Sequence, residues 1–229
     1  SSAETKILDL VEAQTNPTVA PYAKTGEVHL RITAKAESET AAYKLMEPVE
    51  EVLRQRFGTL IYTNDPQVTL EMAIYELLKA NNLTVTTAES CTGGLVAGRL
   101  INVPGISEYL KEGYITYSNE AKQKLLGVPA EILQKYGAVS PQTAEAMAKG
   151  GAKAAEVDVC IAVTGIAGPD GGSLEKPVGL VYMSCYCLGK VYTEKNQYTG
   201  SRSKIREYAV ASALTLLRQA ILDGMCFEN

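Results

Sequence analysis

The chain has few of the residues that metal sites and histidine-based catalysis require. It contains one histidine, His29, and no cluster of other metal-binding side chains. Zinc sites and Ser-His-Asp triads depend on histidine. We therefore expect no metal ion in this protein, and a triad is poorly supported because His29 lies in a different part of the chain from the candidate serine discussed below.

Excess positive charge and long apolar runs are also missing. The 22 Lys and Arg are outnumbered by 26 Asp and Glu, which gives a net charge of −4. This balance disfavours a general attraction to nucleic acid or to anionic membranes, so any recognition of phosphate must be local. The longest apolar run, about residues 178–188, is too short to cross a bilayer.

The cysteines are odd in number, and most lie in apolar or strand-like runs. They are Cys91, Cys160, Cys185, Cys187 and Cys226. This usage predicts reduced thiols in a cytoplasmic protein rather than a disulfide framework. The chain begins with Ser1-Ser2 and no methionine, so we expect a processed protein or an excised fragment.

A turn at residues 64–66 predicts a boundary between two domains, residues 1–65 and 66–229, because proline restricts the residue before it to extended backbone. The first domain reads as helix, strand, helix and strand, over residues 3–14, 28–33, 37–56 and 59–62. It has the size of a KH module, yet it lacks a GXXG loop, and residues 1–66 carry seven Lys and Arg against ten Asp and Glu. Nucleic-acid binding is therefore not expected.

In the second domain, helical and strand-like segments alternate. Strands are expected at residues 83–88, 113–117, 157–164, 178–187 and 190–198, and helices at residues 68–80, 94–102, 119–126, 141–155 and 203–222. This alternation predicts an α/β fold with a mainly parallel sheet covered by helices on both faces, and a ligand crevice at the carboxyl ends of the strands. The hairpin turning at residues 188–190 would add antiparallel strands.

Ser90 is a candidate nucleophile because of where it lies in the chain. The segment 83–94 runs from β-branched residues into a Gly-Gly pair, and a helical pattern follows at once. Such a junction presents side chains beside unpaired backbone N–H groups. The alternative is an ordinary connection in which Ser90 or Thr92 caps the helix.

A base for Ser90 would have to be lysine or tyrosine, and a second strand-to-helix junction offers Tyr117 and Lys122. With Ser118 as N-cap, Lys122 falls in the first helical turn, where the helix dipole disfavours a cation. Lowering its pKa from ~10.4 to near 7 takes roughly 4.6 kcal/mol. The helix end supplies only about 0.3–1 kcal/mol, so burial or a nearby arginine must supply the rest. The alternative is a solvated surface lysine.

Two further segments resemble ligand sites. Residues 159–172 form an apolar strand that ends in a loop with four glycines, which is neither a P-loop nor a GxGxxG motif. A flexible surface loop is the alternative. In residues 198–206, Ser203 as N-cap would place Arg202 and Arg206 at a helix start, where they could bind an anion or simply be solvated.

Five ordered segments together resemble the C-terminal domain of the CinA family, which also occurs alone as the PncC-type nicotinamide-nucleotide amidase. They are TAESCTGG (87–94), GYITYSNEAKQKLLGV (113–128), TGIAGPDGG (164–172), EKPVGLVY (175–182) and GSRSKIR (200–206). Residues 16–36 resemble the small KH-like domain that precedes it in longer CinA proteins. The molybdopterin-binding-like domain that opens those proteins is not in this sequence, which is consistent with a fragment.

The resemblance implies hydrolysis of the carboxamide of nicotinamide mononucleotide to nicotinate mononucleotide and ammonia, through an acyl-serine and without metal or cofactor. Ser90 would be the nucleophile, Lys122 the base and Tyr117 an assisting residue. Backbone N–H groups of Thr92, Gly93 and Gly94, or of Thr164 and Gly165, would hold the oxyanion. Arg202 and Arg206 would meet the phosphate, although Ser201 replaces an aspartate common in the family.

The resemblance also implies a homodimer that binds a pyridine mononucleotide. The cysteine usage predicts a cytoplasmic protein, and the charge balance predicts that it binds neither nucleic acid nor membrane. Two other functions remain open. The domain could be a nucleotide-binding or regulatory module of a longer CinA protein, with weak or no amidase activity. Alternatively Cys91, beside Ser90, could be the nucleophile, although no histidine lies near it in the sequence.

Overall fold

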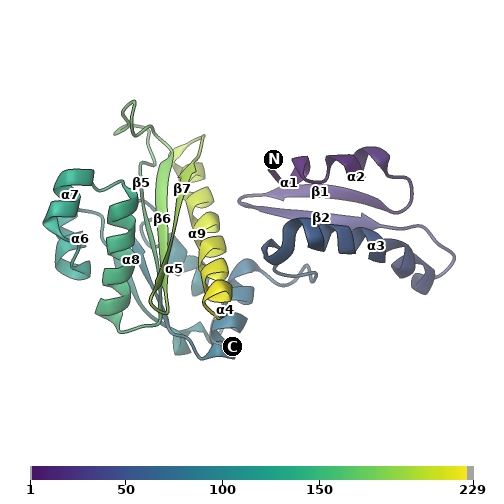
Figure 1. The fold of residues 1–229 in the computed structure, drawn as a ribbon, viewed down its shortest axis with the longest axis horizontal. Helices are drawn as coiled ribbons and strands as arrows, with labels where there is room; N and C mark the ends of the chain where they lie inside the picture. Colours follow the sequence, from purple (N-terminus) through teal and green to yellow (C-terminus); the bar gives the residue numbers. More distant parts are fainter. Residues whose placement is uncertain (1, 226–229) are drawn as a thin grey trace. The chain divides into compact units, whose positions relative to one another are not determined.

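The computed structural model describes residues 2–225, and its backbone contacts divide the chain into two units, one ending at Asn64 and one beginning at Asp65 (Figure 1). Each unit is described separately below. Cys226 lies outside the described residues. Within residues 2–225, no helix is both long and apolar enough to cross a membrane.

The N-terminal unit packs three helices around a two-stranded antiparallel hairpin. Its elements are α1 (Ser2–Thr5), α2 (Leu8–Ala13), β1 (Thr18–Lys24), β2 (Glu27–Thr33), α3 (Glu39–Phe57) and the 3-10 helix η1 (Gly58–Leu60). The strands pair from Thr18 opposite Thr33 to Lys24 opposite Glu27. Ile7, Val19 and Leu53 are buried together at the centre, and they join α2, the hairpin and α3 into one small core.

In this unit one predicted strand is absent and one strand was not predicted. The strand predicted at 59–62 is absent because Gly58 ends α3 with a positive φ of 52° and the chain then turns into η1. The strand β1, which contains Pro21, is not predicted by the sequence pattern. Proline has no N–H for a sheet ladder, and β1 accepts it because this strand pairs with β2 only.

The second unit is built on a five-stranded mixed sheet in the order β4-β3-β5-β6-β7. The strands are β3 (Val85–Glu89), β4 (Leu110–Ile115), β5 (Val159–Gly165), β6 (Leu180–Cys187) and β7 (Lys190–Gln197). β3 runs parallel to both of its neighbours, β4 and β5. β6 and β7 form the predicted antiparallel hairpin at the other edge.

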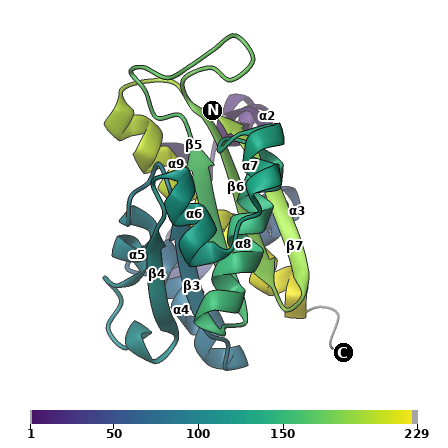
Figure 2. The same ribbon diagram turned by 90° about the vertical axis from the view of Figure 1, so that its left-hand side faces the viewer.

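Helices cover both faces of this sheet, as predicted (Figures 1 and 2). One face carries α4 (Leu70–Asn81), α5 (Leu95–Leu100) and α9 (Arg202–Met225), and the other carries α6 (Asn119–Leu126), α7 (Ala130–Tyr136) and α8 (Pro141–Ala155). A 3-10 helix, η2 (Ile106–Glu108), precedes β4. The sequence analysis did not predict α7, which is only seven residues long.

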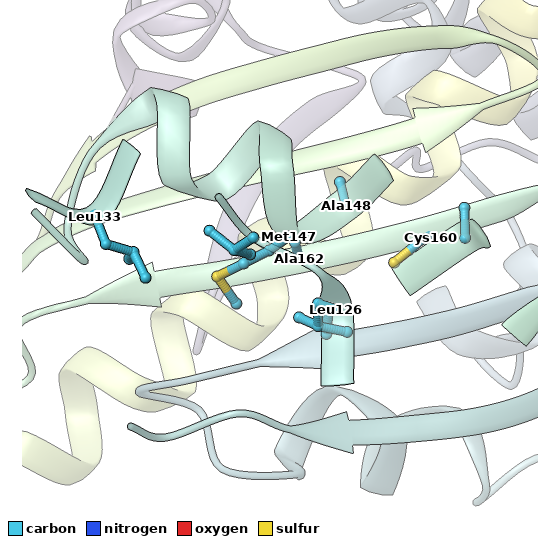
Figure 3. Packing of buried hydrophobic residues seen from close by; sticks show 9 residues of the cluster. Leu126, Leu133, Met147, Ala148, Cys160 and Ala162 are labelled. Carbon is cyan, nitrogen blue, oxygen red and sulfur yellow. The ribbon is translucent and has the colours of Figure 1, made fainter. Parts of the chain in front are cut away.

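The core on the α8 side holds α6 in place (Figure 3). Leu126 of α6 packs with Met147 and Ala148 of α8 and with Cys160 and Ala162 of β5. The helices approach so closely that a Cβ added at Gly150 would lie 1.9 Å from the Leu126 carbonyl oxygen. Close packing of this kind leaves α6, and the lysine that it carries, little freedom to move.

Candidate active site

The carboxyl ends of the three parallel strands meet at one edge of the sheet and hold the candidate residues. Ser90 follows β3, and its N–H donates to the Val163 carbonyl of β5 at 2.9 Å. Thr116 follows β4, and its N–H donates to the Glu89 carbonyl of β3 at 2.8 Å. These bonds tie the segments after the strands to one another, so that the candidate residues lie in one rigid frame.

A cleft of about 260 Å³ opens at this edge. Its lining includes Ser90, Cys91, Tyr117, Lys122, Thr164, Gly165 and Arg202. Residues 166–168, 170 and 171 of the glycine-rich loop complete one wall. The cleft lies at the ends of the strands, where the alternation of helices and strands in the sequence predicts a ligand crevice.

Ser90 and Lys122 are directly paired inside the cleft. The Lys122 Nζ lies 3.1 Å from the Ser90 Oγ and 2.7 Å from the Thr116 carbonyl oxygen. A third, longer contact of 3.4 Å joins Nζ to the Tyr117 carbonyl. Lys122 is only 1 % exposed, so the alternative of a solvated surface lysine is wrong.

Burial controls the charge of this lysine. Removal from water lowers the pKa of Lys122 to about 8, against opposing effects of Cys91 and Glu120. As predicted, Ser118 caps α6 by accepting from the Ala121 N–H, which places Lys122 near the helix start. Since the shift toward the neutral amine comes from desolvation, the lysine has the character that a proton acceptor needs near neutral pH.

The turn after Ser90 is held by a carboxylate that the sequence analysis missed. Glu89 is completely buried, and its carboxylate accepts from the N–H groups of Gly94, Val96 and Ala97 at 2.9–3.1 Å. It therefore fills the start of α5 as a capping anion. The signal for this role was the position of Glu89, a charged residue at the end of an apolar strand. A carboxylate buried there requires several hydrogen-bond donors.

The same turn changes the choice of oxyanion donors. The Gly93 N–H donates to the Ser90 carbonyl at 3.1 Å and the Gly94 N–H to Glu89. Both glycine donors are therefore already engaged. Within residues 2–225, no oxygen accepts from the N–H groups of Cys91 and Thr92, so these are the available donors next to Ser90.

The structure separates the two arginines that were predicted to form one anion site. Arg202 lines the cleft, where it donates to the Gly168 carbonyl at 2.7 Å and to the Tyr117 hydroxyl at 2.9 Å. Arg206 is directed instead to the Cys91 and Thr92 carbonyls, at 3.0 and 2.8 Å. The chain segment thus supplies one arginine to the cleft wall and one to the backbone turn.

The predicted N-cap at Ser203 is wrong. α9 begins at Arg202, so Ser203 lies within the helix. Ser201 takes the capping position, and its Oγ accepts from the Lys204 N–H at 3.4 Å. The sequence Ser201-Arg202-Ser203 offers two serines as caps, and the sequence pattern alone does not choose between them.

The remaining predicted residues lie around the cleft. Tyr117 is 62 % exposed and lies at the mouth, where its hydroxyl meets Arg202. The Thr164 hydroxyl is directed at the Ala138 carbonyl at 2.8 Å. A Cβ on Gly165 would come within 3 Å of Val181 and the Leu180 carbonyl, so a glycine is required there by close packing with β6.

Cys91 has an environment that opposes reactivity. It is 6 % exposed, and burial raises the pKa of its thiol to about 11. Because the thiolate is the reactive form, the alternative in which Cys91 is the nucleophile has no support from its environment.

Among residues 2–225 there is also no group of three side chains suited to hold a metal ion, and His29 lies on β2 of the other unit.

The fold and the site define a class of protein: a mixed-sheet α/β domain with a buried serine–lysine pair in a glycine-lined cleft at the strand ends. Family models identify it further. Residues 67–221 match the CinA C-terminal domain, and residues 1–63 match the KH domain of the damage-inducible protein CinA. The chain belongs to the CinA family.

Individual relatives agree with this assignment. A CinA-like protein of Kosmotoga olearia is 51% identical over 217 residues, which cover 95% of this chain and 52% of the relative. The chain spans about half the length of the curated relatives it matches. The crystal structure of the competence/damage inducible protein CihA from Agrobacterium tumefaciens is similar with a TM-score of 0.65 and 44% identity, over 66% of this chain and 93% of that one. A CinA superfamily protein from Escherichia coli is similar with a TM-score of 0.64 and 34% identity, over 71% and 98% of the two chains.

Proposed function

We propose that the second unit hydrolyses the carboxamide of nicotinamide mononucleotide to nicotinate mononucleotide and ammonia through an acyl-serine intermediate. The observation that carries this proposal is the 3.1 Å contact between the Lys122 Nζ and the Ser90 Oγ in a buried cleft. Two groups at this distance can exchange a proton directly. The CinA family membership supports the choice of an amide substrate.

In the first half of the reaction, neutral Lys122 accepts the proton of the Ser90 hydroxyl while Oγ attacks the carboxamide carbon. The carbonyl oxygen becomes an oxyanion, and its donors are the N–H groups of Cys91 and Thr92, which donate to no oxygen within the described residues. When the C–N bond breaks, the Lys122 ammonium returns its proton to the departing nitrogen, and ammonia leaves. The products of this half are the acyl-serine and neutral Lys122.

In the second half, a water molecule takes the place of ammonia. Lys122 accepts a proton from this water as the oxygen attacks the acyl carbon, and the same proton then returns to the Ser90 Oγ as the ester bond breaks. The other proton of the water stays on the new carboxyl group and passes to solvent, so that nicotinate mononucleotide leaves as the carboxylate. The lysine thus alternates between base and acid without any other titratable group.

The lining of the cleft carries one guanidinium, that of Arg202, and one acidic side chain, that of Asp170. Arg202 is the guanidinium in the lining, and its bonds to Gly168 and Tyr117 fix it at the mouth. A guanidinium recognises phosphate oxygens through paired N–H groups. We assign the phosphate to Arg202, with the pyridine carboxamide directed inward to Ser90.

The test is ammonia release from nicotinamide mononucleotide by the native chain and by Ser90→Ala. We expect the substitution to lower the rate by at least about 10³-fold, the scale on which nucleophile removal acts. Ser107→Ala, an exposed serine of η2, is the matched control and should keep the native rate. Equal rates in Ser90→Ala and the native chain would remove Ser90 from the mechanism.

A second candidate function is a nucleotide-binding or regulatory module, favoured by the fact that the chain spans about half of its curated relatives. For this function, the mononucleotide would raise the melting temperature by mass action without release of ammonia.

The homodimer also remains a proposal, and light scattering of the purified chain measures it.

A further inference from the structure

In the turn that follows β3, the carbonyl groups of Ser90, Cys91 and Thr92 all accept hydrogen bonds. The Ser90 carbonyl accepts from the Gly93 N–H, and the carbonyls of Cys91 and Thr92 accept from the Arg206 guanidinium. The latter two contacts reach across 115 and 114 positions in sequence, from the second turn of α9 to the turn after β3. One side chain therefore holds two consecutive peptide groups.

Holding a carbonyl also determines where the neighbouring N–H points. In a trans peptide the C=O of one residue and the N–H of the next lie in one plane and point in opposite directions. When Arg206 binds the Cys91 carbonyl, the Thr92 N–H is directed away from the arginine. The Thr92 carbonyl, also bound by Arg206, shares its peptide with the Gly93 N–H, which donates to the Ser90 carbonyl and so fixes the Cys91 N–H in turn. Both N–H groups are thereby fixed in direction, and neither donates to an oxygen of residues 2–225, as an oxyanion site requires.

The surroundings of Arg206 fit this role. Ile205, beside it, is 1 % exposed, so the packing of α9 anchors this part of the helix. A Cβ at Gly93, where φ is +61°, would lie 3.4 Å from an Arg206 Nη2 that already donates to the Thr92 carbonyl. Its guanidinium is thus committed to the backbone at two of its nitrogens.

We propose that Arg206 is a positioning residue, which orients the Cys91 and Thr92 N–H groups as the oxyanion donors for Ser90 and does not bind the substrate phosphate. The inference rests on the proposed amidase function, because it assigns a role in that reaction. It separates Arg206 from Arg202, which lines the cleft itself.

The kinetic test compares Arg206→Met with Arg202→Met on two substrates, nicotinamide mononucleotide and the phosphate-free nicotinamide riboside. We expect Arg206→Met to lower kcat about 10²-fold on both substrates, the effect of a misplaced oxyanion donor, with KM nearly unchanged. Arg202→Met should instead raise KM for the mononucleotide alone. A raised KM for the mononucleotide in Arg206→Met, with kcat intact, would show that Arg206 binds phosphate and would overturn the proposal.

A conservative variant separates charge from geometry. Lysine keeps the charge but lacks the planar fork of donors, so Arg206→Lys should remain impaired in kcat, whereas a phosphate ligand would be rescued by lysine. The pH midpoint of the rate should be native in both variants, since Lys122 is untouched. Lys204→Met, an exposed residue two positions away, is the matched control with native kinetics.

Amide hydrogen exchange gives a readout that does not depend on amidase activity. In Arg206→Met we expect faster exchange in residues 90–97 than in the native chain or in Arg202→Met, with the core strands still protected. If the native chain releases no ammonia but this exchange rises, the proposed function fails while Arg206 still holds the turn. Unchanged exchange, or native kinetics in Arg206→Met, would contradict the positioning role.

Discussion

The Lys122 Nζ donates to the Thr116 carbonyl at 2.7 Å, a shorter contact than its 3.1 Å contact with the Ser90 Oγ. The carbonyl accepts a hydrogen from either the ammonium or the neutral amine, so the lysine is held in place in both protonation states. The lone pair of the neutral amine remains for the serine proton. Thr116 thus holds the Lys122 amine in place, while Ser90 is the group that gives it a proton.

The first prediction concerns the pH dependence of the rate. Because only neutral Lys122 accepts the serine proton and burial lowers its pKa to about 8, kcat/KM for the mononucleotide should rise tenfold per pH unit below about pH 8 and level off above it. Steady-state kinetics between pH 6 and 10 measure this profile. Lys122→Arg, which stays charged, should be inactive throughout, and a native kcat/KM that stays level between pH 6 and 8 would refute the lysine base.

The second prediction concerns stability. The pKa of Lys122 is about 8 in the folded chain and 10.5 when unfolded, so between these values the unfolded chain binds more protons and stability rises with pH. The free energy of unfolding should gain about 3 kcal/mol from this residue between pH 7 and pH 10.5. Urea titrations of the native chain and Lys122→Met isolate this gain, which the variant should lack. Parallel pH curves for the two proteins would show that Lys122 is not destabilised by its charge.

The third prediction concerns Cys91. Since burial raises its pKa to about 11, its thiol should resist iodoacetamide at pH 7.5, and Cys91→Ser should keep most of the amidase activity. Peptide mass analysis locates the modified cysteines. Rapid alkylation of Cys91, slowed by the mononucleotide and accompanied by loss of activity, would restore Cys91 as a candidate nucleophile.

The fourth prediction concerns the contact between α6 and α8. Gly150→Ala places a methyl group 1.9 Å from the Leu126 carbonyl oxygen, so it should cost about 1–3 kcal/mol of stability and displace α6 with Lys122. Gly98→Ala in α5 is the matched control, because nothing lies within 4 Å of the added carbon. It should stabilise by about 0.5–1 kcal/mol. Thermal unfolding measures both, and equal effects would contradict the packing argument.

Local patterns in the sequence made Ser90 and Lys122 candidates, and the resemblance to the CinA family paired them as nucleophile and base. Each residue follows a strand, and β3 and β4 are adjacent and parallel, so their carboxyl ends meet. The burial of Lys122 was not predictable from its helix, because the segments that cover it come from other parts of the chain. Without those covering segments, a lysine at the same position of the helix would be exposed to solvent.

The contacts of Arg206 and Glu89 escaped prediction because they reach distant or following parts of the chain. Arg206 binds carbonyls more than a hundred positions away, and nothing in its own segment distinguishes it from Arg202. Glu89 turns back onto the helix that follows it, although it lies in a strand with every residue buried. β1 was missed because Pro21 is uncommon in strands, and an edge position removes that objection.

The Glu89 carboxylate has a consequence for how an anionic ligand enters. A free helix start beside Ser90 would attract the phosphate of a nucleotide and seat it where the carboxamide must go. With that helix end neutralised from within, the phosphate finds its cation at Arg202 on the outer rim. We therefore expect the nucleotide to enter with its uncharged amide first and its phosphate last. The Glu89 carboxylate disfavours the reverse orientation, in which the phosphate would lie beside Ser90.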